Sequence, residues 1–409
     1  MNELHRKNSV ANPLVSTNFS KIPSTNTKVK TAMYANMKRM NNEMAVSPIV
    51  ATLVLIVVAV IGAVAVGTIM GTFSTQVSKQ ASASQAASAS ATEILIAGST
   101  TLLPAELNLQ TDYQKANPGY QLNVQGGGSG AGVASVAEGI SDIGAASSAS
   151  TITGAQTANP NNPAYQNLYY TMIGGRGVVF IQDASMKADP TNVVSTADLN
   201  AAYLDASGNG GKTTVADGNI TNPTTMEQRE ASSGTMSTAF GWIGGSAKGN
   251  TSTGYNNLPT QNGNAAMLAA VQAGTSAAPV IGFVDAGYAF TGSVTSNVTA
   301  SGISVMGVVD GTQTAAYVPT HANIKAALKD WVKGNSQGTN YPQKLTGGLY
   351  WITAGTVPTQ SVNGIITAPG TSAASSVVTN LITFAQSPGE ATAFNNAGMY
   401  SLYDFAPTS

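Results

Sequence analysis

Residues 229–235 read Arg-Glu-Ala-Ser-Ser-Gly-Thr and lead into apolar residues at Met236, Phe240 and Ile243. This spacing predicts that a helix begins at the Ser-Gly-Thr segment. The first backbone N–H groups of a helix lack intrahelical partners and lie at the positive end of the macrodipole, so they favour an anion. Arg229, one short loop upstream, offers a planar set of donors that suits a tetrahedral oxyanion. On its own, such a start is more often an ordinary N-cap than a ligand site.

Two earlier segments repeat this pattern of a strand, a turn and a helix. Residues 94–101 (Ile-Leu-Ile-Ala-Gly-Ser-Thr-Thr) predict a short apolar strand that turns into a helix at its glycine. Residues 122–130 (Leu-Asn-Val-Gln-Gly-Gly-Gly-Ser-Gly) predict an alternating strand that runs into a helix marked by Val133, Val136 and Ile140. Glycines let the backbone approach a ligand closely and aim successive N–H groups into one concavity. Together the three junctions predict a shared oxyanion site.

Four loop motifs, in their order along the chain, resemble those of the phosphate-binding protein of phosphate ABC transporters, the PstS family. The motifs are Gly98-Ser-Thr-Thr, Gln125-Gly-Gly-Gly-Ser-Gly, Asp142-Ile-Gly-Ala-Ala-Ser-Ser and Arg229-Glu-Ala-Ser-Ser-Gly-Thr. Residues 281–288 and 384–402 are also similar to this family, so the resemblance covers about residues 93–405. It implies an α/β fold of two lobes that close on a ligand, the type II periplasmic-binding-protein or Venus-flytrap fold. It also implies a binding protein without a cofactor rather than an enzyme.

The resemblance further assigns the phosphate contacts, position by position. They are Thr100, Thr101, Ser129, Ser147, Arg229, Ser233, Gly234 and Thr235. Ser147 departs from the pattern, because the best-known members have an aspartate there that accepts the proton of hydrogen phosphate and so rejects sulfate. A serine hydroxyl both accepts and donates, which leaves the choice between the two anions open. Ala231 stands where such members have an acid that pairs with the arginine; Glu230 is the neighbouring acid, although an extended segment would point it elsewhere.

The composition is typical of an exported binding domain. Charged residues make up 9% of the chain, against about 25% in ordinary soluble domains. With no Cys the chain has no disulfide, no thiolate metal site and no cysteine for a lipid anchor. His321 is the only histidine beyond the first few residues. The chain therefore offers almost no histidines from which to build a Ser/His/Asp triad or a histidine metal cluster.

An uncharged apolar segment, residues 46–73, exceeds the ~20 residues that are needed to cross a bilayer. Seven of the 18 basic residues precede it, against two of the 19 acidic ones, so we expect its N-terminal side to stay in the cytoplasm and the rest to be exported to the cell surface. This leaves 11 basic and 17 acidic residues from position 46 onward. The net negative charge argues against nucleic acid as a partner, and an anion must be held by local dipoles and a placed arginine.

The start of this apolar segment resembles the N-terminus of archaeal type IV pilins, in which a peptidase cuts just before the hydrophobic helix. Residues 44–53 read Met-Ala-Val-Ser-Pro-Ile-Val-Ala-Thr-Leu, and the resemblance places the cut between Ala45 and Val46. Pro48 suits the first turn of a helix, where its missing N–H costs nothing. An uncleaved signal anchor is the alternative, because hydropathy alone does not separate the two.

The chain is therefore expected to have four parts: a leader at 1–45, a transmembrane or pilin-like helix at 46–73, a Ser/Ala-rich tether at 74–92 and a binding domain at 93–409. The last part exceeds one ordinary core, which indicates two lobes. We expect lobe I at about 93–172 and 350–409, and lobe II at about 173–349. A strand at 174–181 would cross between the lobes, and the chain would return near Tyr350.

Three functions of different classes follow from the sequence. The first is a membrane-tethered extracytoplasmic receptor that captures phosphate for an ABC permease. The second is a pilus subunit that polymerises through residues 46–73 and carries the binding domain on the filament, and it is compatible with the first. The third is an extracellular enzyme that releases phosphate, for which the chain offers few metal ligands.

Overall fold

The computed structural model describes nine stretches of the chain: residues 92–186, 193–204, 224–230, 232–244, 258–310, 315–355, 360–362, 365–367 and 375–405. The chain divides into two units, Met1–Ser88 and Ala89–Ser409, and all of the described residues lie in the second. The predicted leader, cleavage site, apolar helix and tether lie outside the described residues, apart from the last residue of the tether. Within the nine stretches, no helix has the length and apolar character that a bilayer crossing requires.

A mixed sheet forms the centre of the second unit. Its main path runs β2-β1-β3-β14-β4-β9-β6. The bounds are β1 Thr92–Gly98, β2 Tyr120–Gly126, β3 Ile143–Ala146, β4 Tyr169–Asp183, β6 Thr225–Met226, β9 Val280–Asp285 and β14 Thr346–Thr353. The strand β1 is parallel to β2 and β3, whereas β14 is antiparallel to both of its neighbours. Two short strands also pair with β4, namely β12 (Ile303–Val305) and β17 (Tyr400–Ser401).

Helices and small two-stranded ribbons cover this sheet. The helices are α3 Leu103–Ala116, α4 Ser129–Ala137, α5 Ala149–Ala158, α6 Pro163–Gln166, α7 Thr196–Leu204, α8 Gly234–Trp242, α9 Asn264–Gln272, α10 Ala286–Ala289, α11 His321–Lys333, α12 Ser376–Ala385, α13 Ala391–Asn396 and α14 Leu402–Phe405. The ribbons pair β5 (Val193–Ser195) with β13 (Gly307–Val309), β7 (Gln228–Arg229) with β8 (Thr260–Gln261), β10 (Phe290–Thr291) with β11 (Val298–Thr299), and β15 (Gln360–Val362) with β16 (Ile365–Thr367).

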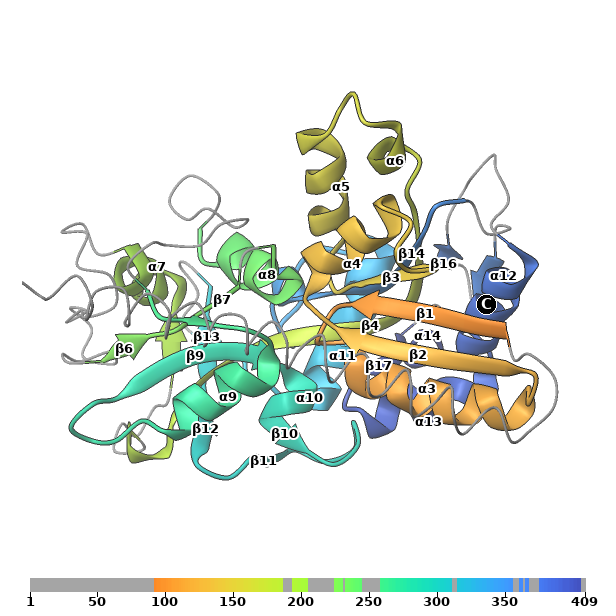
Figure 1. Cartoon of the computed structure of the whole chain (residues 1–409). Helices are drawn as coiled ribbons and strands as arrows, with labels where there is room; N and C mark the ends of the chain where they lie inside the picture. The colour runs from red at the N-terminus through yellow and green to blue at the C-terminus, as the bar shows by residue number, and fades with distance from the viewer. Residues whose placement is uncertain are drawn as a thin grey trace, which may run out of the picture. The chain divides into compact units, whose positions relative to one another are not determined.

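The long strand β4 joins the two halves of the sheet. Figure 1 shows it passing through the middle of the unit, with β1, β2 and β3 on one side and β9 and β6 on the other. Its first half pairs with β14 and its second half with β9. It is buried almost throughout and reads as a near-continuous apolar run, as strands covered on both faces do. The predicted crossing strand at 174–181 is therefore confirmed as a strand, with Tyr350 in its antiparallel neighbour β14.

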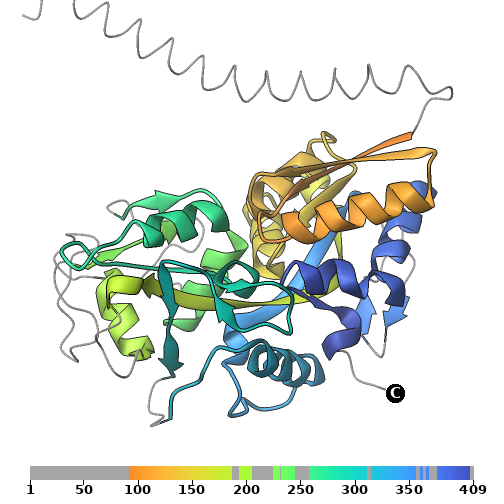
Figure 2. The same ribbon diagram turned by 90° about the horizontal axis from the view of Figure 1, so that it is seen from below.

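Two large hydrophobic cores lie on the two sides of β4. One includes Ile94, Leu109, Trp351 and Phe394, from β1, α3, β14 and α13. The other gathers side chains of β9, α8, α9, α11 and the second half of β4. Figure 2 shows the same two groups of elements from below, with β4 running between them. The residue ranges of the two lobes remain a prediction.

The three predicted strand-to-helix junctions are present, with one error in extent. The strand β1 leads into α3, β2 into α4, and β7 into α8. The sequence placed Ile140 in the helix after β2, but α4 ends at Ala137 and Ile140 is 63% exposed. Gly139 has φ 68°, and the N–H of Ile140 donates to Ser135 O. This left-handed glycine terminates the helix, whose last residue lies three positions before the predicted apolar position.

Candidate functional site

The starts of three helices meet at one point of the second unit. Thr101 Oγ1, just before α3, lies 3.2 Å from Thr235 Oγ1 in the first turn of α8. A Cβ atom added to Gly234 would lie 3.0 Å from Ser129 Oγ, at the start of α4, and 2.5 Å from Ser147 Oγ, just after β3. Only glycine lets the start of α8 approach these two serines so closely. Segments more than a hundred residues apart in sequence thus form a single cluster.

At the start of α8, two backbone N–H groups have no acceptor among the described residues. Ser233 is the N-cap, and its hydroxyl accepts from the N–H of Met236 at 3.3 Å. Among the described residues, none accepts a hydrogen bond from the N–H groups of Gly234 and Thr235. These donors and the positive end of the helix dipole therefore remain for a ligand.

The start of α4 is similar but lacks a side-chain cap. Its N-cap is Gly128, with φ 90° and no side chain to satisfy the first N–H groups. No described residue accepts from the N–H groups of Ser129 or Gly130. Ser129 Oγ instead accepts from the N–H of Ser147 at 3.1 Å and lies 3.3 Å from Ser147 Oγ. The two buried serines are thus held together at the base of the helix.

Arg229 is fully buried and is held by three neighbours. Its Nε and Nη2 donate to the two carboxylate oxygens of Glu230, at 2.7 and 2.9 Å. Its Nη1 donates to Asn264 Oδ1 at 2.7 Å, and Nη2 to Thr100 Oγ1 at 3.1 Å. A guanidinium has five N–H groups, so these contacts leave one on Nη1. Glu230 therefore pairs with Arg229, which the sequence left as an open question. Two residues after Glu230, Ser232 has a left-handed backbone conformation (φ 61°).

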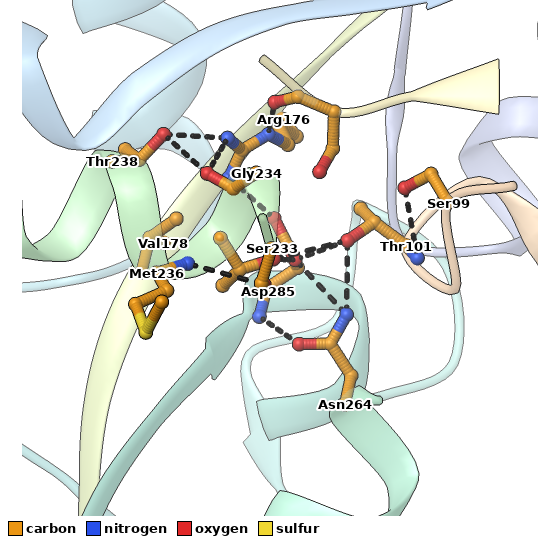
Figure 3. Close-up of polar contacts among 12 residues, drawn as sticks. Ser99, Thr101, Arg176, Val178, Ser233, Gly234, Met236, Thr238, Asn264 and Asp285 are labelled. Atoms are coloured by element: carbon orange, nitrogen blue, oxygen red, sulfur yellow. Dashed lines mark hydrogen bonds and ion pairs between the residues drawn. The ribbon is translucent and has the colours of Figure 1, made fainter. Parts of the chain in front are cut away.

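Asp285, which was not among the predicted site residues, lies at the centre of the cluster (Figure 3). Its Oδ2 accepts from Thr101 Oγ1 at 2.6 Å, from Thr235 Oγ1 at 2.7 Å and from Asn264 Nδ2 at 3.0 Å. Its Oδ1 accepts from Arg176 Nη1 at 2.9 Å. Asp285 is 2% exposed, so a charge there requires the partners that it has.

Arg176, the partner of Asp285, was also missed. From β4 it donates through Nε to Ser147 O at 2.5 Å, and through Nη2 to Gly234 O at 3.1 Å and Thr238 Oγ1 at 2.6 Å. It therefore ties the loop after β3 to the first turn of α8 (Figure 3). A signal was available: Arg176 is a charge in the middle of the long, mostly apolar strand β4, and Asp285 is the last residue of another apolar strand, β9. Charged residues at buried positions are almost always paired.

Tyr288 closes one edge of the cluster as a neutral donor. Its hydroxyl donates to Thr100 O at 2.8 Å. Burial, together with the nearby carboxylate of Asp285, raises the pKa of Tyr288 to about 12, although Arg229 opposes the shift. The phenol therefore keeps its proton at physiological pH and fixes the turn that carries Thr100.

A groove of about 800 Å³ opens beside the cluster. It is lined by Thr100, Gly126, Gly127, Gly130, Ala131, Ala134, Glu230, Ser232, Asn262 and Gly263. Of the eight residues predicted to contact phosphate, Thr100 lines this groove, and the other seven lie in the packed cluster next to it. The structure thus brings all eight together, with the hydroxyl of Ser233 engaged as a helix cap.

Comparison with known proteins identifies the class of fold. The family model described as a PBP superfamily domain matches residues 83–388. The chain therefore belongs to this superfamily of periplasmic-binding-protein-like domains, and its mixed α/β fold is the two-lobed fold expected from the sequence. No curated protein sequence matches the chain significantly.

Solved structures share this fold at low sequence identity. One, named as a putative phosphate ABC transporter substrate-binding protein with bound phosphate from Clostridium perfringens, is 16% identical with a TM-score of 0.51, and the alignment covers 76% of this chain and 99% of that chain. A DING protein is 17% identical with a TM-score of 0.51, covering 75% of this chain and 90% of that one. At such identities the likeness establishes the fold, and the ligand must be argued from the site.

Proposed function

We propose that this protein binds inorganic phosphate as the substrate-binding component of an ABC transporter. The observation that carries the proposal is the meeting of three helix starts beside the buried Arg229, two of which, those of α4 and α8, have backbone N–H groups without an acceptor among the described residues. Such groups are aimed donors for an oxyanion, and bonds to a charged acceptor are stronger than neutral ones. The eight residues that the PstS resemblance assigns to phosphate are those that lie together.

The charges of the cluster are balanced before any ligand enters. Arg176 pairs with Asp285, and Arg229 with Glu230, with contacts of 2.9 and 2.7 Å. An anion would therefore be held mainly by backbone N–H dipoles and by the remaining Nη1 donor of Arg229. A site built from dipoles suits a small anion that fills it and offers several acceptor oxygens.

The proposal extends to the cellular setting. We propose an extracytoplasmic protein that is held at the membrane by residues 46–73 and delivers phosphate to an ABC permease without acting on it chemically. Membership of the PBP superfamily and the resemblance of the ligand loops support this setting. Assembly into a filament through residues 46–73 remains a separate prediction, which concerns a segment outside the described residues.

Isothermal titration calorimetry of the purified protein with phosphate tests the proposal. Arg229→Ala should lose about 2 to 5 kcal/mol of binding free energy, because truncating one member of a buried charged pair also strands the other, here Glu230. Lys329→Ala is the matched control, since it removes an exposed positive charge from α11 and should leave the affinity unchanged. Equal phosphate affinity in the Arg229→Ala variant and the unaltered protein would refute the site.

A further inference from the structure

The hydroxyl groups of Thr101 and Thr235 have an unusual hydrogen-bonding direction. Their oxygens lie 2.6 and 2.7 Å from the same carboxylate oxygen, Asp285 Oδ2. A hydroxyl has a single proton, and an ionised carboxylate only accepts. Both protons therefore point at Asp285, and each threonine oxygen turns lone pairs toward its remaining neighbours.

The surrounding contacts fix this direction. Arg176 Nη1 donates to the other oxygen of Asp285, which holds the carboxylate in place. Asn264 Oδ1 accepts from Arg229 Nη1 and from the N–H of Asp285, so its Nδ2 must face Asp285 and Thr101. All four groups that contact the Asp285 carboxylate are donors. The alternative acceptor for each threonine proton is the other threonine oxygen at 3.2 Å, and the shorter contacts to Asp285 Oδ2 take both protons instead.

We infer that Asp285 is a specificity-determining positioning residue: by taking both hydroxyl protons, it makes Thr101 and Thr235 hydrogen-bond acceptors toward the ligand and selects an oxyanion that still carries a proton. The inference rests on the proposed function and deepens it. Hydrogen phosphate has an O–H to donate, whereas sulfate has none. Ser147 alone leaves the choice between phosphate and sulfate open. This choice would come from the carboxylate of Asp285, which contacts the two threonines rather than the ligand.

The expected discrimination follows from the unmet hydrogen bonds. A sulfate oxygen that faces a threonine lone pair gains no bond and meets another acceptor, whereas the O–H of hydrogen phosphate makes a bond there. A single such difference at a buried position changes affinity by roughly tenfold or more. At about pH 8 the two dianions have the same charge and a similar shape, so the proton is the main difference between them.

The test compares dissociation constants for phosphate and sulfate by calorimetry, with arsenate and selenate as a second pair of protonated and unprotonated anions. Thr235→Val and Thr101→Val keep the side-chain shape and remove the acceptor. Hydrogen phosphate and hydrogen arsenate each have one O–H, so the variant at the threonine that accepts it should weaken their binding about tenfold. Neither variant should weaken the binding of sulfate or selenate, so the selectivity ratio falls. If the two hydroxyls instead donate to the anion, their removal should weaken the binding of all four anions.

Asp285→Asn adds a test that reverses polarity. Arg176 keeps the amide oxygen on its side, so the new NH2 group faces the threonines and turns their protons toward the ligand. Sulfate should then gain on phosphate. Ser237→Ala is the control, because Ser237 lies on the same helix as Thr235 and its hydroxyl pairs with Ser150 Oγ at 2.8 Å rather than with Asp285 or Arg176. The selectivity ratio of this variant should equal that of the unaltered protein.

The outcomes separate this inference from the proposed function. An unaltered protein that binds no tetrahedral anion would overturn both. If the protein binds phosphate but both valine variants leave the phosphate-to-sulfate selectivity ratio unchanged, the inference alone is overturned. Equal binding of phosphate and sulfate by the unaltered protein would also overturn the inference alone. If Asp285→Asn does not fold, the nearly isosteric valine variants decide.

Discussion

Glu106 is a buried carboxyl group in the first turn of α3, and Glu106→Gln should remove a large pH dependence of the protein's stability. The side chain is 1% exposed, and Trp351 Nε1 donates to its Oε1 at 2.7 Å. Burial raises the pKa of Glu106 from 4.5 to about 8, although the bond from Trp351 opposes the shift. The folded protein therefore holds this carboxyl group neutral at physiological pH.

The magnitude follows from the two pKa values. Below pH 4.5 the carboxyl group is protonated in both the folded and the unfolded chain, so the folded state has its full stability. As the pH rises toward about 8, the unfolded chain ionises while the folded chain does not, and stability falls by about 1.4 kcal/mol per pH unit. The total loss is roughly 4 to 5 kcal/mol, complete once the pH exceeds the folded pKa.

Urea unfolding at a series of pH values between these limits measures the effect. The glutamine introduced by Glu106→Gln keeps a carbonyl oxygen for Trp351 but cannot ionise, so this variant should gain stability over the unaltered protein as the pH rises. Glu138→Gln, the same change on an exposed side chain at the end of α4, is the reference. A stability difference between Glu106→Gln and the unaltered protein that stays constant with pH would refute the reasoning.

Gly234→Ala should weaken phosphate binding roughly tenfold or more, because the new methyl group would lie 2.5 Å from Ser147 Oγ. Gly241→Ala, in the same helix with no atom within 4 Å, should leave the affinity unchanged in calorimetry, and equal effects would contradict the packing argument. Arg176→Met should lower the free energy of unfolding by about 3 to 5 kcal/mol, since it strands Asp285. Adding Asp285→Leu should recover part of this loss in urea unfolding, whereas simple additivity would argue against a coupled pair.

Local chemistry explains what the sequence could predict. The junctions at Gly98, Gly128 and Ser233 depend on glycine, hydroxyl and helix-capping signals within a few residues, so their strand-turn-helix form could be read directly. The resemblance to PstS supplied the order of the loops. Ile140 shows the limit of periodicity, because a glycine in the left-handed conformation ends the helix before the apolar pattern does.

Long-range pairing explains what the sequence could not predict. Asp285 is 184 residues from Thr101, 109 from Arg176 and 50 from Thr235 along the chain. No local pattern indicates which of the buried charges will meet, because the sheet register decides it. Asn264 carried even less signal, since an amide at a helix start is an ordinary capping residue.

The two neutral ion pairs of the cluster have a consequence for the effect of ionic strength. Dissolved salt screens exposed charges, but it acts weakly on buried pairs such as Arg176–Asp285 and on hydrogen bonds to backbone N–H groups. The chain from position 46 onward is net negative, with 11 basic and 17 acidic residues, so its overall charge repels an approaching anion rather than attracting it. The affinity for phosphate should therefore be nearly the same at low and at high salt concentration. Added salt should, however, increase the association rate of the anion.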